Sequence, residues 1–403
     1  MRRCFVCHYH EIALKKKNRH FFERKLVENI KRALGSLPYG SVRLWSRRVV
    51  VELREDSPVG DIRNRLGRVF GLANYASAWI VSSALENLQT AAWELIQSRE
   101  YESFRISAKR SDKRYPLTSP EIERQLGGFL QKRSTKRVQL DKPDLTCYVQ
   151  ILGEEALVHF EKLRGPGGLP VSTSGKVAVL ISGGIDSPVA AYKIMKRGCR
   201  PLFVHFHSHP HTSLEAQDKV MELVEHLCRH QPSARLYMVP FASAQRNIVA
   251  LTPARTRVIL YRRMMVRIAN RIATRGKAKA LVTGDSVGQV SSQTLDNIRV
   301  VSAVSQLPIL RPLIGDDKEE IITLAKRIGT FEVSIGADDD CCSMFVPKHP
   351  ETNAKIEQVE QAEAPLAIEE IVSAALQGTE RHLIDDTVKD SPPPDRKDVP
   401  SET

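Results

Sequence analysis

Residues 177–188 read VAVLISGGIDSP, and this stretch decides the fold of the C-terminal half of the chain. Five consecutive apolar residues, 177–181, are typical of a strand that is buried on both faces of a parallel sheet. Gly183 and Gly184 then permit a tight turn whose backbone N–H groups can face an anion. Ser187 and Pro188 suit the N-cap and the first position of a helix, whose dipole favours the same anion. The stretch therefore predicts a strand, a phosphate-binding turn and a helix in succession.

The group that this turn is expected to bind is a pyrophosphate. The chain contains no G-x-x-x-x-G-K-[ST] pattern, so the lysine that serves the phosphates in a P-loop is missing. The pyrophosphate that leaves when ATP donates AMP is then the expected occupant. The alternative interpretation is a strand–glycine–helix turn that binds nothing.

Strand-like and helical segments alternate after this stretch. Further strands are expected near residues 202–206, 236–239 and 280–283. Strands separated by helices predict a doubly wound α/β domain built on a parallel sheet. Residues 165–170, GPGGLP, form the clearest linker, and the Asp-, Lys-, Ser- and Pro-rich residues after 385 are expected to be a disordered tail.

The part of the chain before the linker predicts two smaller α+β units. The expected helices are 21–34, 61–70 and 85–98, and the expected strands are 42–51 and 104–110. A further helix is expected to begin with Ser119 as its N-cap and Pro120 at its first position.

The net charge of the 403-residue chain is +13, and it is concentrated at one end. Residues 1–170 hold 31 Lys and Arg against 19 Asp and Glu, a net of +12, whereas residues 171–403 carry a net of +1. This asymmetry favours a nucleic-acid-binding part joined to an electrically ordinary part, with solvated basic faces as the alternative. We expect a cytoplasmic protein, because no apolar run reaches the roughly 20 residues that span a bilayer and no signal-peptide pattern is present.

Seven cysteines are scattered along the chain and do not indicate a disulfide framework. Cys4, Cys7 and His8 match the C-x-x-C-H haem-attachment string, but they lie in an apolar run. We interpret the two cysteines as small side chains of a first strand, and we predict no set of metal ligands.

Residues 182–187, SGGIDS, resemble the PP-loop of ATP pyrophosphatases, and a longer series of segments is similar to the tRNA 4-thiouridine synthetases (tRNA uracil 4-sulfurtransferases). These segments, in family order, are 11–19, 108–113, 165–176, 182–187, 204–208, 283–286, 311–314 and 340–342. The resemblance implies an α/β PP-loop ATP pyrophosphatase domain with a doubly wound parallel sheet, preceded by α+β ferredoxin-like and THUMP domains. The implied ranges are 1–74 for the ferredoxin-like domain, 75–165 for the THUMP domain, 166–171 for the linker, 172–384 for the PP-loop domain and 385–403 for the tail.

The same resemblance implies a nucleotide site. Its residues are Leu180, Ile181, Ser182, Gly183, Gly184, Ser187, His205, Phe206, Arg262, Gly284 and Gln293. Phe206 is expected along adenine, with core packing as its alternative, and Arg262 is expected at a phosphate. Asp186 is implied in the magnesium–pyrophosphate geometry, or else caps a helix. Lys318 is implied to neutralise charge as pyrophosphate leaves, or else is a surface lysine.

Sulfur chemistry is implied for Cys341, with Cys342 as the reserve candidate, because a thiolate can carry or resolve a persulfide. Many members of the family carry a C-terminal rhodanese-like domain, and the 62 residues after Cys341 are too few for one. The partner of Cys341 in a disulfide therefore stays open among Cys342, Cys199 and Cys228. Lys16 is a second departure, since the family usually has glycine there.

The implied reaction uses ATP and Mg²⁺ to adenylate O4 of a tRNA uridine, at position 8, and a persulfide sulfur then displaces AMP to leave 4-thiouridine. The expected partners are tRNA, a cysteine desulfurase as sulfur donor, a small sulfur-carrier protein and a second copy of the chain, with no membrane. A second role in thiamine biosynthesis also follows from the family. Clustered cations are expected to follow the tRNA phosphates, namely Lys109, Arg110, Lys113, Arg114, Lys132, Arg133, Lys136 and Arg137.

Two other hypotheses compete with this reaction. One is another PP-loop RNA-adenylating enzyme, such as an amidotransferase or an RNA lysine ligase. The other is a non-catalytic tRNA-binding protein with a relic loop. RNA-dependent pyrophosphate release separates all three.

Overall fold

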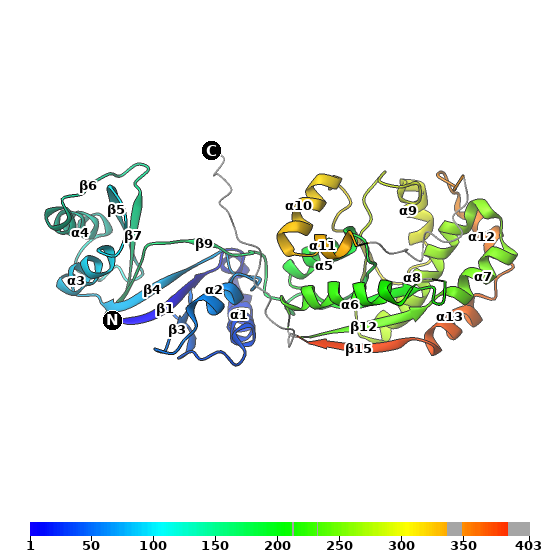
Figure 1. Cartoon of the computed structure of the whole chain (residues 1–403), viewed down its shortest axis with the longest axis horizontal. Helices are drawn as coiled ribbons and strands as arrows, with labels where there is room; N and C mark the ends of the chain where they lie inside the picture. Colours follow the sequence, from blue (N-terminus) through cyan, green and yellow to red (C-terminus); the bar gives the residue numbers. More distant parts are fainter. Residues whose placement is uncertain (212, 232, 337–348, 386–403) are drawn as a thin grey trace. The chain divides into compact units, whose positions relative to one another are not determined.

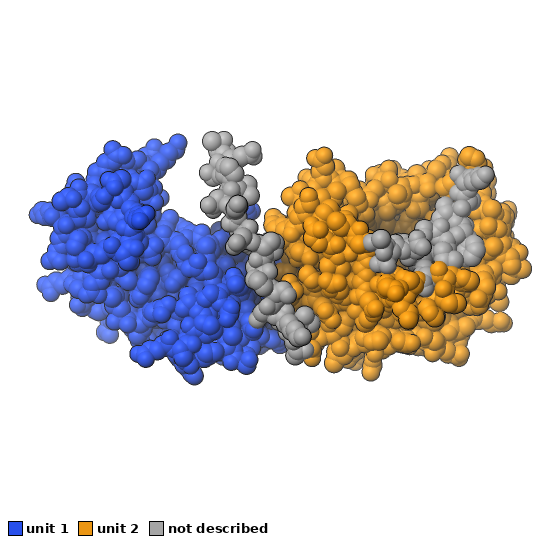
Figure 2. All heavy atoms as spheres, in the orientation of Figure 1, with its two compact units in different colours: residues 1–170 blue, residues 171–403 orange. Residues whose placement is uncertain are grey.

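The computed structural model describes residues 1–211, 213–231, 233–336 and 349–385, and it divides the chain at residue 170. Residues 1–170 form unit 1 and residues 171–403 form unit 2 (Figure 2). Each unit has its own sheet and its own buried apolar cores. None of the described helices is long and apolar enough to cross a membrane.

Unit 1 is built on a single nine-stranded sheet (Figure 1). The strand order is β2-β3-β1-β4-β8-β7-β5-β6, and β9 pairs beside β8 on β4. The strands are β1 Arg2–His8, β2 Val42–Leu44, β3 Val49–Glu52, β4 Asn74–Ser82, β5 Ser103–Arg110, β6 Arg137–Val138, β7 Leu145–Leu152, β8 Glu155–His159 and β9 Leu163–Arg164. The helices are η1 Glu11–Asn18, α1 Arg19–Leu34, α2 Val59–Leu66, α3 Leu85–Ile96 and α4 Ser119–Ser134.

Strand β4 links the two regions that the sequence divides into ferredoxin-like and THUMP domains. It pairs with β1 from Asn74 to Ile80 and, on its other edge, with β8. Tyr75 lies in the core under α1 and α2, whereas Val81 lies in the core under α3 and α4. The boundary expected at residue 74 thus falls on the first residue of a strand that belongs to both cores.

Local backbone geometry corrects two expected elements. Residues 42–51 form the hairpin β2–β3 rather than one strand, because Ser46 and Arg47 adopt φ angles of 46° and 62°. Helix α4 is capped by Thr118 rather than Ser119. Thr118 and Glu121 form a reciprocal capping box, in which Thr118 N donates to Glu121 Oε2 at 2.6 Å.

Lys16, the departure from the family's usual glycine, adopts a φ of 42° and a ψ of −115° within η1. Glycine reaches this conformation without steric cost, whereas a residue with a Cβ carries strain on the order of 1–3 kcal/mol. The structure therefore gives a physical reason for glycine at this position.

Unit 2 contains a six-stranded sheet in the order β14-β13-β10-β11-β12-β15. The strands are β10 Lys176–Leu180, β11 Arg200–His207, β12 Ser233–Pro240, β13 Leu281–Val282, β14 Ile309–Leu310 and β15 Glu380–Asp385. The first five are parallel, which confirms the α/β fold class and the four expected strands. The antiparallel edge strand β15 was not foreseen from the sequence.

Helices cover both faces of this sheet (Figure 1). One face carries α5 Asp186–Lys196, α6 Leu214–Cys228, α10 Lys318–Ile328 and α11 Phe331–Ser334, and the other carries α7 Ala242–Leu251, α8 Arg257–Arg275, α9 Leu295–Ser302, α12 Ile356–Glu363 and α13 Ile368–Gln377. Helix α8 supplies much of the core of the second face through side chains such as Tyr261, Met264 and Ile268.

A buried ion group fastens α12 to α8. Glu363 accepts hydrogen bonds from Arg263 Nη2 and Arg267 Nη2, each at 2.8 Å. Arg263 is 1% exposed and Glu363 is 4% exposed. Burial opposes the ionisation of Glu363, but the two guanidinium groups hold its pKa below the ordinary value. Glu363 therefore forms a charged contact with Arg263 and Arg267 that joins two helices far apart in the sequence.

We expect Glu363→Ala to lower the free energy of unfolding of unit 2 by about 3–5 kcal/mol, because Arg263 would stay buried without its carboxylate. Urea unfolding followed by far-UV circular dichroism measures the loss. Glu369→Ala is the matched control, since its pair with Arg271 at 2.9 Å is exposed and should contribute less than about 1 kcal/mol.

The three tryptophans, at positions 45, 79 and 93, all lie in unit 1, so their fluorescence should report an unchanged transition for that unit. A Glu363→Gln variant should have a lower free energy of unfolding than wild type at neutral pH. This difference should shrink as the pH falls from about 4.3, the pKa of glutamate in the unfolded chain, through the lowered pKa of Glu363 in the folded chain, because the wild-type carboxyl then becomes protonated as well. Equal losses in Glu363→Ala and Glu369→Ala would contradict the role of the buried pair.

Candidate active site

The candidate site lies where the strand order of unit 2 reverses. The chain runs from β10 outward through β11 and β12 on one side, and then returns to β13 and β14 on the other. In open α/β sheets such a switch point leaves a crevice outside the carboxyl ends of the strands. Residues 181–186 follow β10 and Gly284 follows β13, so the two segments meet at this point.

The approach between these segments is close. A Cβ at Gly284 would lie 2.9 Å from Ser187 N and 3.0 Å from the carbonyl carbon of Asp186. Those atoms belong to the backbone and cannot move aside cheaply, so a side chain at residue 284 would displace the first turn of α5. Gly284 is required here by space rather than by its φ angle.

Ser187 closes the turn between β10 and α5. Its Oγ accepts a hydrogen bond from Ser182 N at 2.9 Å and donates to Ser182 O at 3.2 Å. Ser187 therefore lies inside the first turn of α5 and is not the expected N-cap. The residue at the N-cap position is Ile185, whose side chain makes no capping hydrogen bond. The start of α5 thus presents backbone N–H groups and the positive end of the helix dipole without a side-chain cap.

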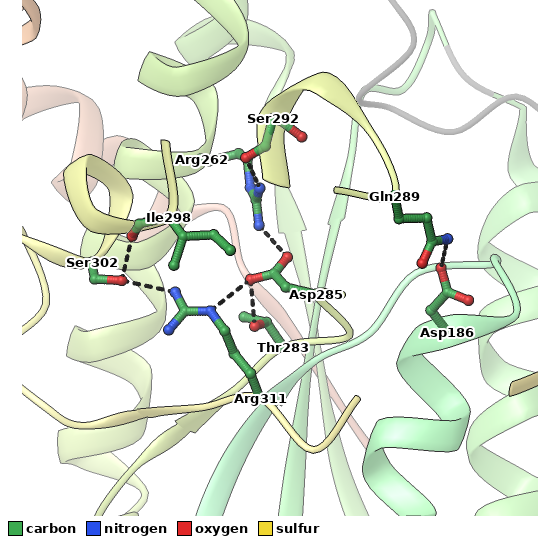
Figure 3. A network of polar contacts seen from close by, with 9 residues as sticks. All are labelled: Asp186, Arg262, Thr283, Asp285, Gln289, Ser292, Ile298, Ser302 and Arg311. Atoms are coloured by element: carbon green, nitrogen blue, oxygen red, sulfur yellow. Dashed lines mark hydrogen bonds and ion pairs between the residues drawn. The ribbon is translucent and has the colours of Figure 1, made fainter. Parts of the chain in front are cut away.

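Asp186 and Lys318, which are 132 positions apart, lie in contact. Lys318 Nζ donates to Asp186 Oδ1 at 2.7 Å. Gln289 Nε2 donates to the other oxygen, Oδ2, at 2.8 Å (Figure 3). The structure therefore brings together Asp186 and Lys318, two of the four predicted catalytic residues, and it adds Gln289, which the sequence did not single out.

A second carboxylate, Asp285, organises the arginines beside this turn (Figure 3). Arg262 Nη2 donates to Asp285 Oδ1, and Arg311 Nε donates to Asp285 Oδ2 at 3.0 Å. Thr283 Oγ1 donates to Oδ2 at 2.8 Å. Asp285 is buried, which opposes its ionisation, but Arg262, Thr283 and Arg311 hold its pKa below the ordinary value.

These contacts fix the orientation of both guanidinium groups. Arg262 Nη1 also donates to Ser292 O at 2.9 Å, and Arg311 Nη2 donates to Ser302 Oγ at 2.8 Å. Arg262 was predicted for the nucleotide site, whereas Asp285 and Arg311 were not. Their presence in the segments 283–286 and 311–314 was the signal that could have identified them.

The other predicted nucleotide residues lie around the same edge of the sheet. The Nδ1–H of His205 donates to Ile181 O at 3.0 Å, which ties the ends of β10 and β11 together. Phe206 is only 5% exposed and packs edge-to-face on Phe241, with ring centroids 5.5 Å apart, so in this structure it is a core residue. Gln293 Oε1 is buried and has no hydrogen-bond partner among the described residues.

The four cysteines considered for sulfur chemistry fall into two sets. Cys341 and Cys342 lie outside the described residues. Cys199 precedes β11 and Cys228 ends α6, so both lie at the amino ends of the strands, opposite the edge that carries Asp186. Helix α5 alone, with 11 residues, separates the two edges by about 16 Å. Both thiols are buried, and neither is placed to reach the PP-loop.

Cys4 and Cys7 are buried on opposite faces of β1, in agreement with their interpretation as strand side chains. Burial raises the pKa of the Cys4 thiol to about 12. No cluster of three potential metal ligands occurs among the residues that the structure describes.

The eight predicted RNA-binding cations do not form one patch. Lys109, Arg110, Lys113 and Arg114 lie at or after the end of β5, whereas Arg137 pairs with Ser103 at its start. The six residues of β5 that separate its start from Lys109 span about 20 Å. Lys132, Arg133 and Lys136 belong to the second group, because α4 ends just before β6.

Some of these cations already have partners. Arg114 forms an ion pair with Asp112 at 2.7 Å, and Lys136 forms one with Glu102 at 2.7 Å. The guanidinium of Arg133 lies over the ring of Phe129. Lys109, Lys113 and Lys132 are exposed, and within the described part of the chain their side chains have no ion-pair partner.

Three family models match the chain. Residues 172–368 match "Thiamine biosynthesis protein (ThiI)", residues 4–76 match "ThiI ferredoxin-like domain" and residues 83–161 match "THUMP domain". Together they reproduce the order of domains that the sequence implies.

Curated relatives extend along nearly the whole chain. A protein of Thermus thermophilus named "Probable tRNA sulfurtransferase" is 44% identical, over 96% of this chain and 95% of its own length. A protein of Moorella thermoacetica with the same name is 43% identical, over 92% of this chain and 95% of its own.

Among solved structures, a 4-thiouridine synthetase–RNA complex with bound ATP matches with a TM-score of 0.87 and 33% identity. The match covers 96% of this chain and all of that one. The structure of PH1313 from Pyrococcus horikoshii matches in fold, with a TM-score of 0.62 and 22% identity over 81% of this chain and 99% of that one.

Proposed function

We infer the reaction of this chain from its family. The chain belongs to the tRNA sulfurtransferase family and is therefore a tRNA-modifying enzyme. We propose that it adenylates O4 of a tRNA uridine, at position 8, with ATP and then replaces that oxygen with sulfur to give 4-thiouridine. The observation that carries the proposal is the contact of Asp186 with Lys318 beside an uncapped helix start at the switch point of the sheet.

In the first step, O4 of the uracil attacks the α-phosphorus of ATP. A bond forms between O4 and the α-phosphorus. The bond between the α-phosphorus and the oxygen that links it to the β-phosphorus breaks, and pyrophosphate leaves with that electron pair. Negative charge therefore grows on the leaving group. The N–H groups at the start of α5 and the ammonium of Lys318 are arranged to stabilise it.

Mg²⁺ fits this site through Asp186. Magnesium is commonly held by one or two carboxylates together with substrate phosphates, and the Asp186 carboxylate lies at the loop that would bind the pyrophosphate. When bound, the ion supplies charge neutralisation to the phosphates. Lys318 and Gln289 hold both oxygens of Asp186 in place beforehand.

Two other groups support nucleotide binding. The buried Oε1 of Gln293 is an acceptor that a donor of the bound nucleotide would satisfy, since a buried polar atom without a partner is costly. Arg262, held by Ser292 O and by Asp285, the residue after Gly284, supplies a guanidinium group of fixed orientation. Both residues stay in the proposed site, together with the loop residues 182–187, Leu180, Ile181 and His205.

In the second step, a persulfide on Cys341 delivers the sulfur. Its terminal sulfur attacks C4 of the adenylated uracil and AMP leaves, which joins C4 to Cys341 through a disulfide. A second thiol then attacks the sulfur of Cys341, releases 4-thiouridine and leaves a protein disulfide that an external thiol reduces. A cysteine desulfurase, directly or through a small sulfur-carrier protein, would renew the persulfide, and the same transfer would serve thiamine biosynthesis.

We expect Asp186→Asn to lower RNA-dependent pyrophosphate release by at least about 100-fold, because the variant keeps the shape of the side chain but loses its charge. Binding of tRNA should be unchanged, since the excess positive charge lies in residues 1–170. The matched control is Asp218→Asn on the exposed surface of α6. An Asp186→Asn enzyme that forms pyrophosphate at the wild-type rate would contradict the loop assignment.

The two groups of cations should contribute separately to tRNA affinity. Replacing Lys109 and Lys113 with alanine should lower the slope of log affinity against log salt by about 0.7–0.9 for each lost phosphate contact. Replacing Lys132 and Arg137 tests the other end of β5 in the same way. Replacement of Arg275 and Lys279, two exposed cations of unit 2, is the control. If neither pair changes the slope, the RNA surface lies elsewhere.

Cys341→Ser should leave pyrophosphate release intact and stop thiolation, because a hydroxyl cannot form a persulfide. Cys342→Ser should be milder if Cys341 is the active residue. Cys199→Ser and Cys228→Ser should not change thiolation, since both thiols lie at the opposite edge of the sheet. The measurements are 4-thiouridine in tRNA from cells and pyrophosphate in vitro. Normal 4-thiouridine with Cys341→Ser would remove that residue from the mechanism.

A further inference from the structure

Asp186 is held by two donors of different charge. Gln289 donates to Oδ2 through a neutral amide at 2.8 Å (Figure 3), and Lys318 donates to Oδ1 through an ammonium at 2.7 Å. A neutral donor and a cation respond differently to a second cation at the same carboxylate. The two contacts therefore have different fates when a metal ion binds at Asp186.

The ammonium of Lys318 competes with a metal ion for the Asp186 carboxylate. A divalent cation repels the ammonium, and it attracts the carboxylate about twice as strongly as a single charge at the same distance. The Lys318 side chain is 45% exposed, so its ammonium can leave the carboxylate without becoming a buried unpaired charge. Asp186 is the first residue of α5, so the ammonium already lies beside the N–H groups that would bind the pyrophosphate.

The amide of Gln289 does not compete in this way. It carries no net charge, so a metal ion at Asp186 does not expel it. An ionised carboxylate has about four lone-pair sites, so it can accept from the amide and bind a metal ion together. Once Lys318 has moved, Gln289 is the donor that remains on Asp186 among the contacts of the described residues.

The loop that carries Gln289 is held by backbone hydrogen bonds. Val287 N donates to Ile314 O at 3.2 Å, and Gly288 N donates to Gln293 O at 3.1 Å. Replacement of the Gln289 side chain leaves both of these bonds in place. A variant at this position therefore removes the contact with Asp186 and keeps the course of the loop.

We propose that Gln289 is a positioning residue for Asp186, which keeps the carboxylate aimed while Lys318 leaves it for the phosphates of Mg²⁺–ATP. This assignment rests on the proposed function. The exchange forms and breaks no covalent bond, and Lys318 keeps its proton as it passes to the charge that develops on pyrophosphate. Gln289 contacts neither ATP nor the uracil and acts only through Asp186.

The first test measures Mn²⁺ binding to the nucleotide-free full chain by electron paramagnetic resonance, with Mn²⁺ as the probe of a metal site at Asp186. Gln289→Met should weaken the binding about tenfold, as expected when the hydrogen-bond partner of a metal-binding carboxylate is lost. Lys318→Met should strengthen it at least about threefold at low ionic strength, because a competing cation is removed. Gln358→Met and Lys279→Met, at exposed positions, are the matched controls and should change nothing.

The second test separates positioning from a structural role. In Gln289→Met, the Mg²⁺ concentration that gives half-maximal RNA-dependent pyrophosphate release should rise about tenfold. The dissociation constant of ATP in EDTA should stay within about twofold of wild type, because the loop still presents Gln293. A loop that is merely disturbed would weaken metal-free ATP as well, and that result would overturn the positioning role.

The remaining outcomes separate the two levels of inference. If Asp186→Asn binds Mn²⁺ as wild type does, the proposed metal site and this assignment fail together. If Asp186→Asn loses Mn²⁺ but Gln289→Met binds it normally, only the role of Gln289 is overturned. Weaker Mn²⁺ binding in Lys318→Met would overturn the exchange, because the lysine would then support the metal ion rather than compete with it.

Discussion

The site depends on how closely two strand ends approach at one point of the sheet. Gly284, after β13, leaves no room for a Cβ against Ser187 N at the start of α5. This approach sets the crevice at the switch point, since β10 and β13 are neighbours in space although about one hundred residues separate them in the chain. Asp186 and Asp285 stand next to this contact in the chain, because Asp186 directly precedes Ser187 and Asp285 directly follows Gly284.

Each of these carboxylates is held by donors that come from distant segments. The Asp186 carboxylate accepts hydrogen bonds from Gln289 and Lys318, and the Asp285 carboxylate accepts them from Arg262 and Arg311. A buried carboxylate between two guanidinium groups stays ionised, so its side chain cannot rotate without leaving charges uncompensated. The orientation of the site is thereby fixed before any ligand arrives, which is the condition for electrostatic stabilisation of a developing charge.

Much of this arrangement could be predicted from the sequence because its signals are local. The run 177–188 predicts strand β10, the turn and helix α5, and the strand pattern predicts the parallel sheet. The N-cap was misplaced because Ser187 bonds backward to Ser182, a choice that depends on the conformation of the intervening glycines. Gln289 could not be predicted, since only the folded loop carries its amide to Asp186, 103 positions earlier.

The other features that the sequence did not predict depend on contacts between residues far apart in the chain. Strand β15 pairs with β12 across about 140 residues, and nothing in Glu380–Asp385 itself indicates an edge of this sheet. The predicted basic residues form two groups along the sequence, 109–114 and 132–137, and only the direction of β5 shows that these groups lie at opposite ends of a strand. For Phe206 the sequence left a base platform and core packing as alternatives, and its ring contact with Phe241 supports core packing.

The sharing of β4 by two cores has a consequence for how this protein could be assembled in evolution. A recombination breakpoint near residue 74 would cut between β1 and the strand that pairs with it along seven residues, and each fragment would expose an unpaired edge. The two N-terminal regions are therefore inherited together or rebuilt together. A gene fusion that moves the THUMP region elsewhere has to supply a substitute neighbour for β4, so modularity in the sequence does not imply free exchange in the fold.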